Sequence, residues 1–321
     1  ILVDKNTNLK CFNVFKKNIY NDKKIFKIII DYGEDFKNLE TCKKIWDFLS
    51  IKSCDRNSLL VNLGGGVVTD IGGFVASTIK RGIDFINVPT TLLSMVDASL
   101  GGKTGVNLNS LKNQIGVFKH PIFILIDLNF LNTLPKLEIR NGFSEMIKHG
   151  LIYNKNHWNE LYKINTPNID NIKDHIFSSI LIKNSIILDD PYEKSIRKIL
   201  NFGHTIGHAI ESYFLANKKN KTLSHGHSIA IGIIIEGYIS GEILNFNLDE
   251  INKIKFIFNN VFSKVIFTKK DINEIIDLLH HDKKNLGGRI NFVLLKKIGN
   301  PKVDIQVPLN IIKKGFDFYQ S

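Results

Sequence analysis

Two histidines, His204 and His208, lie four residues apart in the segment "NFGHTIGHAIE". In a helix this spacing places both imidazoles on one face, where they can bind a metal ion or pack against neighbouring side chains. The segment lacks the glutamate that flanks the first histidine in zinc-protease helices. Taken alone, the pair is therefore typical of ordinary helix packing, and a metal site needs ligands from elsewhere in the chain.

A carboxylate and another histidine occur in other segments with helical periodicity. Glu145 lies in "FSEMIKHG", and His225 begins the segment "HGHSIAIG". One carboxylate with two imidazoles is the ligand set of a catalytic zinc site that keeps coordination positions open for substrate. The residues alone do not decide which two histidines take part, and they do not bring the three helices together.

Three consecutive glycines begin the segment "GGGVVTD" at residues 64–70. The segment joins an apolar, strand-like run to a helix, and this is the edge of a parallel sheet where backbone N–H groups bind pyrophosphates. Thr69 occupies the third glycine position of the GxGxxG pattern. By itself the segment predicts a nucleotide site no better than it predicts a tight turn.

A second glycine-rich segment, "LGGKTGVN" at residues 100–107, ends like the phosphate loop of nucleotide hydrolases. That loop needs a glycine where Asp97 stands, and it follows a strand, whereas this segment follows a helical run. We therefore exclude an ATPase loop. Gly101, Gly102 and Lys103 remain a predicted anion-binding corner beside Asp97.

The elements that must position these residues fall into two halves. Before residue 135, strand-like runs alternate with helical ones, which favours a Rossmann-like parallel sheet in an α/β domain; the runs are residues 24–30, 58–63, 84–89 and 122–128. After it, six segments have helical periodicity and only "RINFVLL" is strand-like. We predict an α/β domain over residues 1–135 and a mainly α-helical domain over residues 136–321.

The chain has 321 residues and a formal charge of +12, with 43 Lys and Arg against 31 Asp and Glu. Only five of the basic residues are Arg, and the lysines are scattered among Asn and Ile. An AT-rich coding sequence explains this composition better than a nucleic-acid interface does.

No stretch approaches the roughly 18 uninterrupted apolar residues of a membrane span. The most apolar segment, residues 228–241, contains Glu236 and is predicted to be a buried helix. Cys11, Cys42 and Cys54 form no CxxC pair, which indicates reduced thiols and a cytoplasmic protein. The chain begins on apolar residues without Met, so we expect preceding sequence.

Taken together, these segments closely resemble 3-dehydroquinate synthases, enzymes of the shikimate pathway. The matching segments follow one another in the family's order and cover nearly the whole chain: "DYGEDFK", "NLGGGVVTDIGGFVAST", "KRGIDFINVPTTLLSMVDASLGGKTGVNL", "KNQIGVF", "TLP", "SEMIKHGLI", "RKILNFGHTIGHAIE", "SHGHSIAIG" and "HDKKNLGGRINFVLL". The resemblance implies an NAD-binding α/β domain and a helical metal- and substrate-binding domain.

The resemblance also implies which residues bind the cofactors. Zinc, with cobalt as an alternative, would be held by Glu145, His204 and His225. The residues implied to contact NAD are Tyr32, Gly33, Glu34, Asp35, Phe36, Lys37, Gly65, Gly66, Val67, Val68, Thr69, Asp70, Thr90, Thr91, Lys103, Lys112, Phe130, Leu131, Asn132 and Thr133.

Catalytic and substrate-binding residues follow from the same resemblance. Glu193 and His208 match positions that handle protons, and Lys103 and Arg197 match further catalytic positions. The residues implied to contact the substrate's carboxylate, hydroxyls and phosphate are Arg81, Asp97, Lys103, Asn113, Lys148, Lys183, Arg197, Asn201, His208 and one of Lys283 or Lys284.

The implied reaction converts 3-deoxy-D-arabino-heptulosonate 7-phosphate into 3-dehydroquinate and phosphate. It proceeds by transient oxidation with NAD, phosphate elimination, return of the hydride and intramolecular aldol closure, in a protein expected to be a homodimer. The alternatives are another sugar-phosphate cyclase, a metal-dependent polyol dehydrogenase of the same fold, and a basic nucleic-acid-binding protein.

The sequence departs from the family pattern at several positions near the implied sites. Thr69 stands where Gly is usual, Pro191 where Glu is usual and Ser195 where Gly is usual. His227 replaces Glu in the common "HGE", and His149 replaces an aromatic or small residue. None of these positions is an implied metal ligand.

Overall fold

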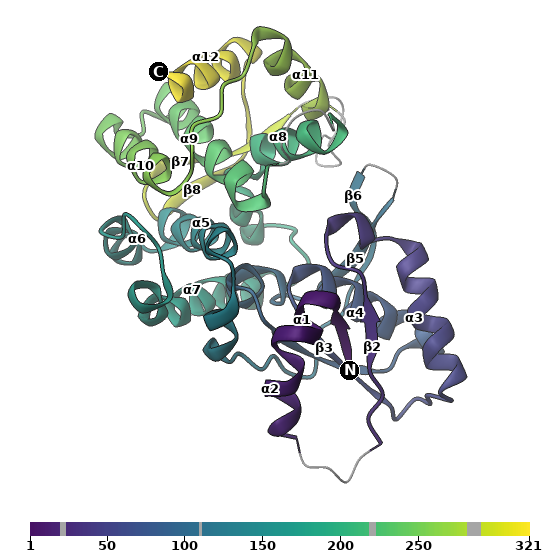
Figure 1. Cartoon of the computed structure of the whole chain (residues 1–321). Helices are drawn as coiled ribbons and strands as arrows, with labels where there is room; N and C mark the ends of the chain where they lie inside the picture. The colour runs from purple at the N-terminus through teal and green to yellow at the C-terminus, as the bar shows by residue number, and fades with distance from the viewer. Residues whose placement is uncertain (20–23, 109–110, 218–222, 281–289) are drawn as a thin grey trace. The chain divides into compact units, whose positions relative to one another are not determined.

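The structure is a computed structural model of the whole chain, and it describes all residues except 20–23, 109–110, 218–222 and 281–289. The chain divides into two compact units, Ile1–Ile139 (unit 1) and Arg140–Ser321 (unit 2). This division falls inside helix α5 (Lys136–Tyr153), which begins directly after Pro135. Figure 1 colours the chain from purple at its N-terminus to yellow at its C-terminus.

Unit 1 contains a four-stranded sheet in the order β2-β1-β3-β4, in which every neighbouring pair is parallel. The strands are β1 (Leu2–Asp4), β2 (Ile28–Ile30), β3 (Leu59–Gly64) and β4 (Asp84–Pro89). The predicted parallel sheet is therefore confirmed. The helices of unit 1 are α1 (Lys5–Lys10), α2 (Phe12–Lys17), α3 (Leu39–Ile51) and α4 (Gly66–Thr78), with short helical turns η1 (Glu34–Phe36), η2 (Ile79–Arg81), η3 (Ser94–Ala98) and η4 (Leu128–Thr133).

Several predicted strands differ from the observed ones. The predicted strand at residues 122–128 forms only in part. Backbone hydrogen bonds join Ile122, Phe123 and Leu125 to β4, Ile124 makes an isolated bridge to Asn87, and a helical turn begins at Leu128. The run at residues 24–30 forms a strand only over its last three residues. An antiparallel hairpin of β5 (Lys103–Leu108) and β6 (Leu111–Phe118) was not predicted.

Helix α4 packs closely on β3 because glycines face the sheet. A Cβ on Gly72 would lie 1.8 Å from Oδ1 of Asn62, a buried side chain of β3. The Asn62 amide in turn donates to Oδ1 of Asn87 on β4 at 2.9 Å. The glycines at this end of the sequence motif therefore serve helix packing, while Gly65 and Gly66 lie at the start of the helix.

Unit 2 is mainly helical, as predicted, with one antiparallel hairpin. Its elements after α5 are α6 (Lys155–Tyr162), α7 (Ile169–Asp189), η5 (Ile196–Asn201), α8 (His204–Ala216), α9 (His225–Leu244), α10 (Leu248–Val261), α11 (Lys269–His280), β7 (Asn291–Lys297), β8 (Asn300–Gln306) and α12 (Leu309–Gln320) (Figure 1). Strand β7 contains the predicted strand-like run, whereas its partner β8 was not predicted.

Helix α9 forms the core of unit 2, and glycines let α8 approach it. Fourteen of its residues are buried, and it contacts α8, α10, α12 and β7. A Cβ on Gly232 of α9 would lie 2.0 Å from the Gly203 carbonyl oxygen, and one on Gly207 would lie 3.1 Å from that of Ser228. This backbone contact brings the first residues of the two helices, His204 and His225, close together.

Helix α9 is also long and apolar enough to meet the length and composition criteria of a membrane span. However, 72% of its apolar window is buried inside the structure. It matches the buried helix that the sequence predicted.

Candidate metal centre and nucleotide turn

Three side chains from separate helices of unit 2 converge at one point. The Nε2 atoms of His204 and His225 lie 3.6 Å and 3.9 Å from Oε1 of Glu145. The ligand atoms of the three residues all lie within 4.8 Å of one another. Each residue is positioned by its helix, because Glu145 lies within α5 while His204 and His225 are the first residues of α8 and α9.

The Glu145 carboxylate has the surroundings expected of a metal ligand. Its side chain is 0% exposed, and neither oxygen accepts a hydrogen bond from the residues that the structure describes. The ammonium group of Lys148, one turn along α5, forms an ion pair with it. Lys148 supplies one counter-charge to this buried carboxylate, and a divalent cation between Glu145 and two neutral imidazoles would supply a further one. The residues present therefore fit a zinc or cobalt ion.

Both histidines hold their other ring nitrogen against an oxygen. Nδ1 of His225 lies 3.3 Å from Oε2 of Glu211, and Nδ1 of His204 lies 3.2 Å from the Phe202 carbonyl oxygen. An Nδ1–H donor in each ring leaves Nε2 unprotonated and facing Glu145. This is the tautomer that a metal ion requires.

His208 is the third imidazole of the cluster. Its ring centroid lies 5.1 Å from that of His204 and 6.0 Å from that of His225. The structure thus brings His208 beside the candidate metal centre, where it can exchange protons with a bound substrate. A second group of three potential ligands, His208, Glu211 and His225, overlaps the first.

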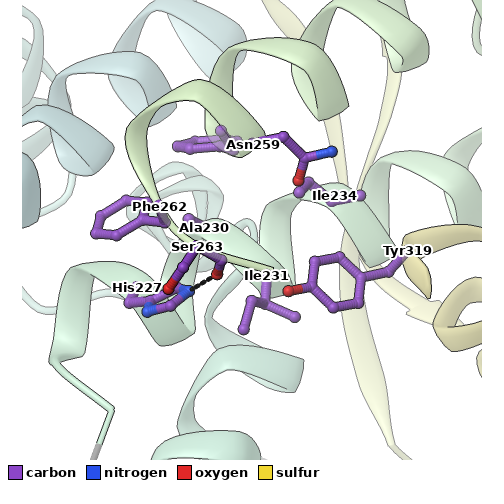
Figure 2. Close-up of a pocket in the computed structure, with 9 residues that line it drawn as sticks. His227, Ala230, Ile231, Ile234, Asn259, Phe262, Ser263 and Tyr319 are labelled. Atoms are coloured by element: carbon purple, nitrogen blue, oxygen red, sulfur yellow. Dashed lines mark hydrogen bonds between the residues drawn. The ribbon is translucent and has the colours of Figure 1, made fainter. Parts of the chain in front are cut away.

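His227 lies two residues from His225 but belongs to a different environment. Its Nε2 lies 3.0 Å from the Ser263 carbonyl oxygen, and its ring stacks on Phe262 at 4.6 Å (Figure 2). Burial lowers the pKa of His227, and the Ser263 carbonyl partly opposes that shift. This departure from the family pattern therefore does not add an imidazole to the metal centre.

The pocket shown in Figure 2 lies beside His227 and is too small for a sugar phosphate. Its volume of about 10 Å³ is close to the space that a single water molecule needs. Ala230, Ile231 and Tyr319 are among the residues that line it. The pocket is a small gap between α9, α10 and α12.

Buried cationic side chains occur in unit 2 at the predicted substrate positions. Lys148, Lys183 and Arg197 are each at most 6% exposed. Lys148 forms an ion pair with Glu145, and the Arg197 guanidinium donates to the Pro191 carbonyl oxygen. Three positive charges in one unit favour the binding of an anionic ligand.

The loop that carries Glu193 and Arg197 is organised by Asp190, which the sequence analysis did not single out. Its carboxylate accepts hydrogen bonds from the backbone N–H groups of Lys194, Ser195 and Arg197 at 3.0, 2.6 and 3.1 Å. Burial raises the pKa of Asp190, but these hydrogen bonds outweigh it and lower the pKa to about 2. Ser195 therefore does not disturb the loop despite replacing glycine.

Within this loop, Glu193 has a positive φ of 56°. Its carboxylate accepts a 2.6 Å hydrogen bond from the Asn201 amide. Two residues predicted for the site, one for proton handling and one for substrate contact, are thereby placed together.

In unit 1 the glycine turn ends at the first turn of α4. Gly65 is the N-cap residue and offers no side chain to cap the helix. A Cβ on Gly65 would lie 3.0 Å from Thr91 Cγ2, and one on Gly66 would lie 3.1 Å from Ala98 Cβ. The turn thus presents helix N–H groups at the carboxyl end of β3, which is the arrangement that binds a pyrophosphate.

Thr69 does not obstruct this turn. Its side chain is buried, and its hydroxyl donates to the Gly66 carbonyl oxygen at 3.1 Å. Val68 is also buried and packs against Gly64, so only its backbone can reach a ligand.

Residues predicted to contact NAD and substrate are linked around Lys37. Its ammonium group donates to Oδ2 of Asp70 at 2.5 Å and to Oδ1 of Asn113 at 2.6 Å. Nearby, Glu34 accepts a 2.9 Å hydrogen bond from Asn107, and its Oε1 lies 3.6 Å from the Lys112 ammonium group. The "YGEDFK" turn is therefore fixed to the β5–β6 hairpin.

The other predicted residues of unit 1 have varied surroundings. Tyr32, Asp35, Asn132 and Thr133 are exposed, whereas Phe130 and Leu131 are buried. Thr90 is buried, and the Thr91 hydroxyl accepts a hydrogen bond from the Ser94 N–H. Gly33, at the start of the "YGEDFK" turn's helical part, has a φ of 107°. The remaining positions of unit 1 predicted to contact NAD or substrate include Phe36, Val67, Asp97 and Lys103.

Of the remaining predicted substrate residues, Arg81 lies far from the glycine turn of unit 1. Arg81 follows α4 and lies at the end of that helix opposite to Gly65 and Gly66. With a rise of about 1.5 Å per residue, a helix of this length separates its ends by roughly 20 Å. Lys283, with its alternative Lys284, lies outside the described residues.

Two buried carboxylates near the metal centre were missed by sequence reasoning. Glu211 lies in the quoted segment "NFGHTIGHAIE", three residues after His208, so helical spacing could have marked it. Glu236 accepts hydrogen bonds from the N–H groups of Gly203 and Ile206, at the start of α8. The sequence carries no signal for that contact, because it depends on how α8 and α9 cross.

Comparisons with known proteins were made for the whole chain. Family models described as "3-dehydroquinate synthase N-terminal" and "3-dehydroquinate synthase C-terminal" match residues 27–141 and 142–285. A 3-dehydroquinate synthase of Parabacteroides distasonis is 42% identical, over 100% of this chain and 91% of that protein.

Solved structures with the same fold include two sugar-phosphate cyclases. The 2-epi-5-epi-valiolone synthase of Streptomyces hygroscopicus subsp. jinggangensis, with NAD+ and Zn2+ bound, has a TM-score of 0.89 at 22% identity and covers 100% of this chain and 90% of that chain. A 2-deoxy-scyllo-inosose synthase, complexed with carbaglucose-6-phosphate, NAD+ and Co2+, has a TM-score of 0.84 at 26% identity, with 98% and 89% covered.

Proposed function

The chain belongs to the 3-dehydroquinate synthase family, and on that premise we propose that it converts 3-deoxy-D-arabino-heptulosonate 7-phosphate into 3-dehydroquinate and phosphate. The observation that carries the proposal is the convergence of Glu145, His204 and His225 in unit 2. Buried cationic side chains in the same unit suit a substrate with both a carboxylate and a phosphate.

We propose that Glu145, His204 and His225 hold zinc or cobalt, and that Gly65, Gly66 and the Lys37 network receive NAD. When bound, the metal supplies Lewis acidity toward a substrate hydroxyl, and NAD supplies a hydride acceptor that is regenerated within the cycle. The cofactors of the solved relatives support this assignment. Unit 1 is then the NAD-binding domain, and unit 2 is the metal- and substrate-binding domain.

The chain's own residues have separate tasks in this proposal. Lys148, Lys183 and Arg197 bind the anionic groups of the substrate, and they favour the extra negative charge that develops when the proton next to a ketone is removed. His208 and the Glu193–Asn201 pair hold protons beside the reacting atoms. Enclosure and orientation then favour the aldol closure.

The reaction is tested by incubating the protein with the heptulosonate phosphate, NAD and zinc. We expect phosphate and dehydroquinate in equal amounts without accumulation of NADH. Accumulating NADH would instead identify a polyol dehydrogenase, and turnover of a heptulose phosphate that lacks the carboxylate would identify another cyclase.

The ligand assignment is tested with His204→Ala, which should abolish both metal binding and turnover. His227→Gln is the matched control, because His227 lies close in sequence but faces Ser263 and Phe262. Retention of zinc and activity in His204→Ala would refute the assignment.

We also propose a homodimer in the cytoplasm that does not depend on nucleic acid or membranes. The three cysteines are free thiols, as is usual for a protein of a reducing compartment. The dimer is proposed from the family resemblance alone. Light scattering tests the dimer, and salt-dependent retention on DNA would contradict the absence of a nucleic-acid partner.

A further inference from the structure

At the candidate metal centre, α8 and α9 each contribute one carboxylate that contacts the other helix. Each helix begins with a candidate ligand, His204 in α8 and His225 in α9, and each carries one buried glutamate that contacts the other helix. Glu211 of α8 contacts His225, and Glu236 of α9 contacts the first turn of α8. The two contacts are reciprocal across one helix pair.

Glu236 fixes the position of the first turn of α8. Its Oε2 accepts from the Gly203 N–H at 2.6 Å, and its Oε1 accepts from the Ile206 N–H at 3.0 Å. The N-cap residue Gly203 has no side chain, and it takes a left-handed φ of 80°. Glu236 of α9 therefore takes the place of the N-cap side chain that α8 lacks. Its negative charge is favoured at the positive end of the helix dipole. His204 lies in the sequence between Gly203 and Ile206, the two residues whose N–H groups Glu236 binds.

Glu211 fixes the orientation of the His225 ring. Its Oε2 lies 3.3 Å from Nδ1 of His225, while Nε2 of the same ring faces Glu145 at 3.9 Å. A carboxylate that accepts the Nδ1 proton sets the tautomer, restrains the ring and makes Nε2 a stronger donor to a cation. Glu211 is buried, so solvent screens this interaction weakly.

Glycines at the crossing of α8 and α9 bring the two helices into close backbone contact. Gly232 approaches the Gly203 carbonyl so closely that a Cβ would lie 2.0 Å from the oxygen. A side chain at Gly203 or Gly232 would force the helices apart, so the short distances from Glu211 and Glu236 to their partners depend on glycine at these positions.

We propose that Glu211 and Glu236 are positioning residues that hold His225 and His204 ready to bind a divalent cation, each acting across the α8–α9 contact. The inference deepens the metal centre of the proposed function and rests on it. Glu211 acts on the protonation and direction of one ring, whereas Glu236 acts on the backbone that carries the other.

The test measures the affinity of the metal-free protein for Co2+ and Zn2+ by chelator competition, without substrate or NAD. For loss of such a supporting carboxylate we expect affinity to fall by roughly 10-fold to 100-fold. Glu211→Gln keeps a hydrogen-bond acceptor and should lie near the lower end, while Glu211→Met removes the acceptor and should lie near the upper end. Glu236→Gln should also weaken binding.

Two further measurements separate positioning from general stability. The melting temperature of metal-free Glu211→Gln should stay close to that of the unchanged protein, while the visible spectrum of its Co2+ complex shifts. Glu242→Gln is the matched control on α9, because Glu242 is partly exposed and pairs with Lys314 at 3.7 Å. It should change neither affinity nor spectrum.

The outcomes are distinguishable from failure of the metal centre itself. If the unchanged protein binds Co2+ and both Glu211 variants bind it equally well, the positioning role is refuted while the metal centre stands. If the unchanged protein fails to bind either metal, the metal centre and this inference are both refuted. If Glu236→Gln does not fold, the Glu211 pair still decides the proposal.

Discussion

Replacing His157 with Gln should make unit 2 more resistant to acid. His157 lies on α6, and its Nε2 lies 3.0 Å from the Ser179 hydroxyl, which also lies 3.3 Å from Nδ1 of His149. Burial, with a smaller contribution from charge repulsion by the nearby His175, lowers the pKa of His157 to about 4. The folded protein therefore keeps His157 neutral at pH values where an unfolded chain binds a proton.

The sign and size of the effect follow from proton linkage. Above the ordinary pKa of 6.5, His157 is neutral in both states and does not affect the pH dependence. As the pH falls from 6.5 to about 4, only the unfolded state binds the proton, so the free energy of unfolding falls. At about 1.4 kcal/mol per pKa unit, the loss reaches about 3 kcal/mol at the lower limit.

The assay is urea unfolding of the unchanged protein and of His157→Gln at several pH values between 7.5 and 4.5, followed by helical circular dichroism. Gln cannot titrate but can still hydrogen-bond with Ser179. As the pH falls, the free energy of unfolding of His157→Gln should increase steadily relative to that of the unchanged protein. His175→Gln, at a partly exposed position of α7, is the control and should retain most of the acid sensitivity. Parallel pH curves for the unchanged protein and His157→Gln would refute the reasoning.

Two other perturbations test the packing of unit 1 and the loop of unit 2. Gly72→Ala should destabilise the protein by about 1–3 kcal/mol in urea unfolding, because its Cβ would meet Asn62 at 1.8 Å. Gly237→Ala is the control, because its Cβ would meet its nearest neighbour at 4.0 Å, and it should be neutral or stabilising. Equal changes in the free energy of unfolding at both sites would contradict the packing argument. Asp190→Asn should speed hydrogen exchange of the Arg197 amide at neutral pH. Because the pKa of Asp190 is lowered to about 2, the unchanged protein should lose the carboxylate's contribution only as the pH falls from 3.8 through 2, and equal exchange in both proteins would exclude the role of Asp190.

The helices that carry the candidate metal ligands could be predicted from the sequence because their periodicity is long and strong. Glu145 falls within an observed helix, α5, which contains the quoted segment "FSEMIKHG". His225 begins a helix, as expected, and the most apolar segment is a buried helix. In each of these cases local propensity and burial favour the same element.

Elements that depend on a distant partner were harder to predict. The β5–β6 hairpin contains Lys, Asn and Gly, which have low intrinsic strand preference, and it forms because the two segments pair with each other. The apolar run at residues 122–128 has strand-like composition, yet it pairs with β4 only over Ile122–Leu125 and forms no regular strand. The reciprocal contacts of Glu211 and Glu236 likewise depend on a helix crossing that no local pattern encodes.

The ion pair between Glu145 and Lys148 bears on the order in which the protein folds and acquires its metal. The two residues are one turn apart on α5, so the counter-charge of the buried carboxylate is supplied by its own helix. Unit 2 can therefore close its core around Glu145 before any cation arrives, unlike small zinc domains, which stay unfolded without metal. We therefore expect the metal-free protein to be folded, so that the supply of metal would change its active fraction rather than the amount of folded chain.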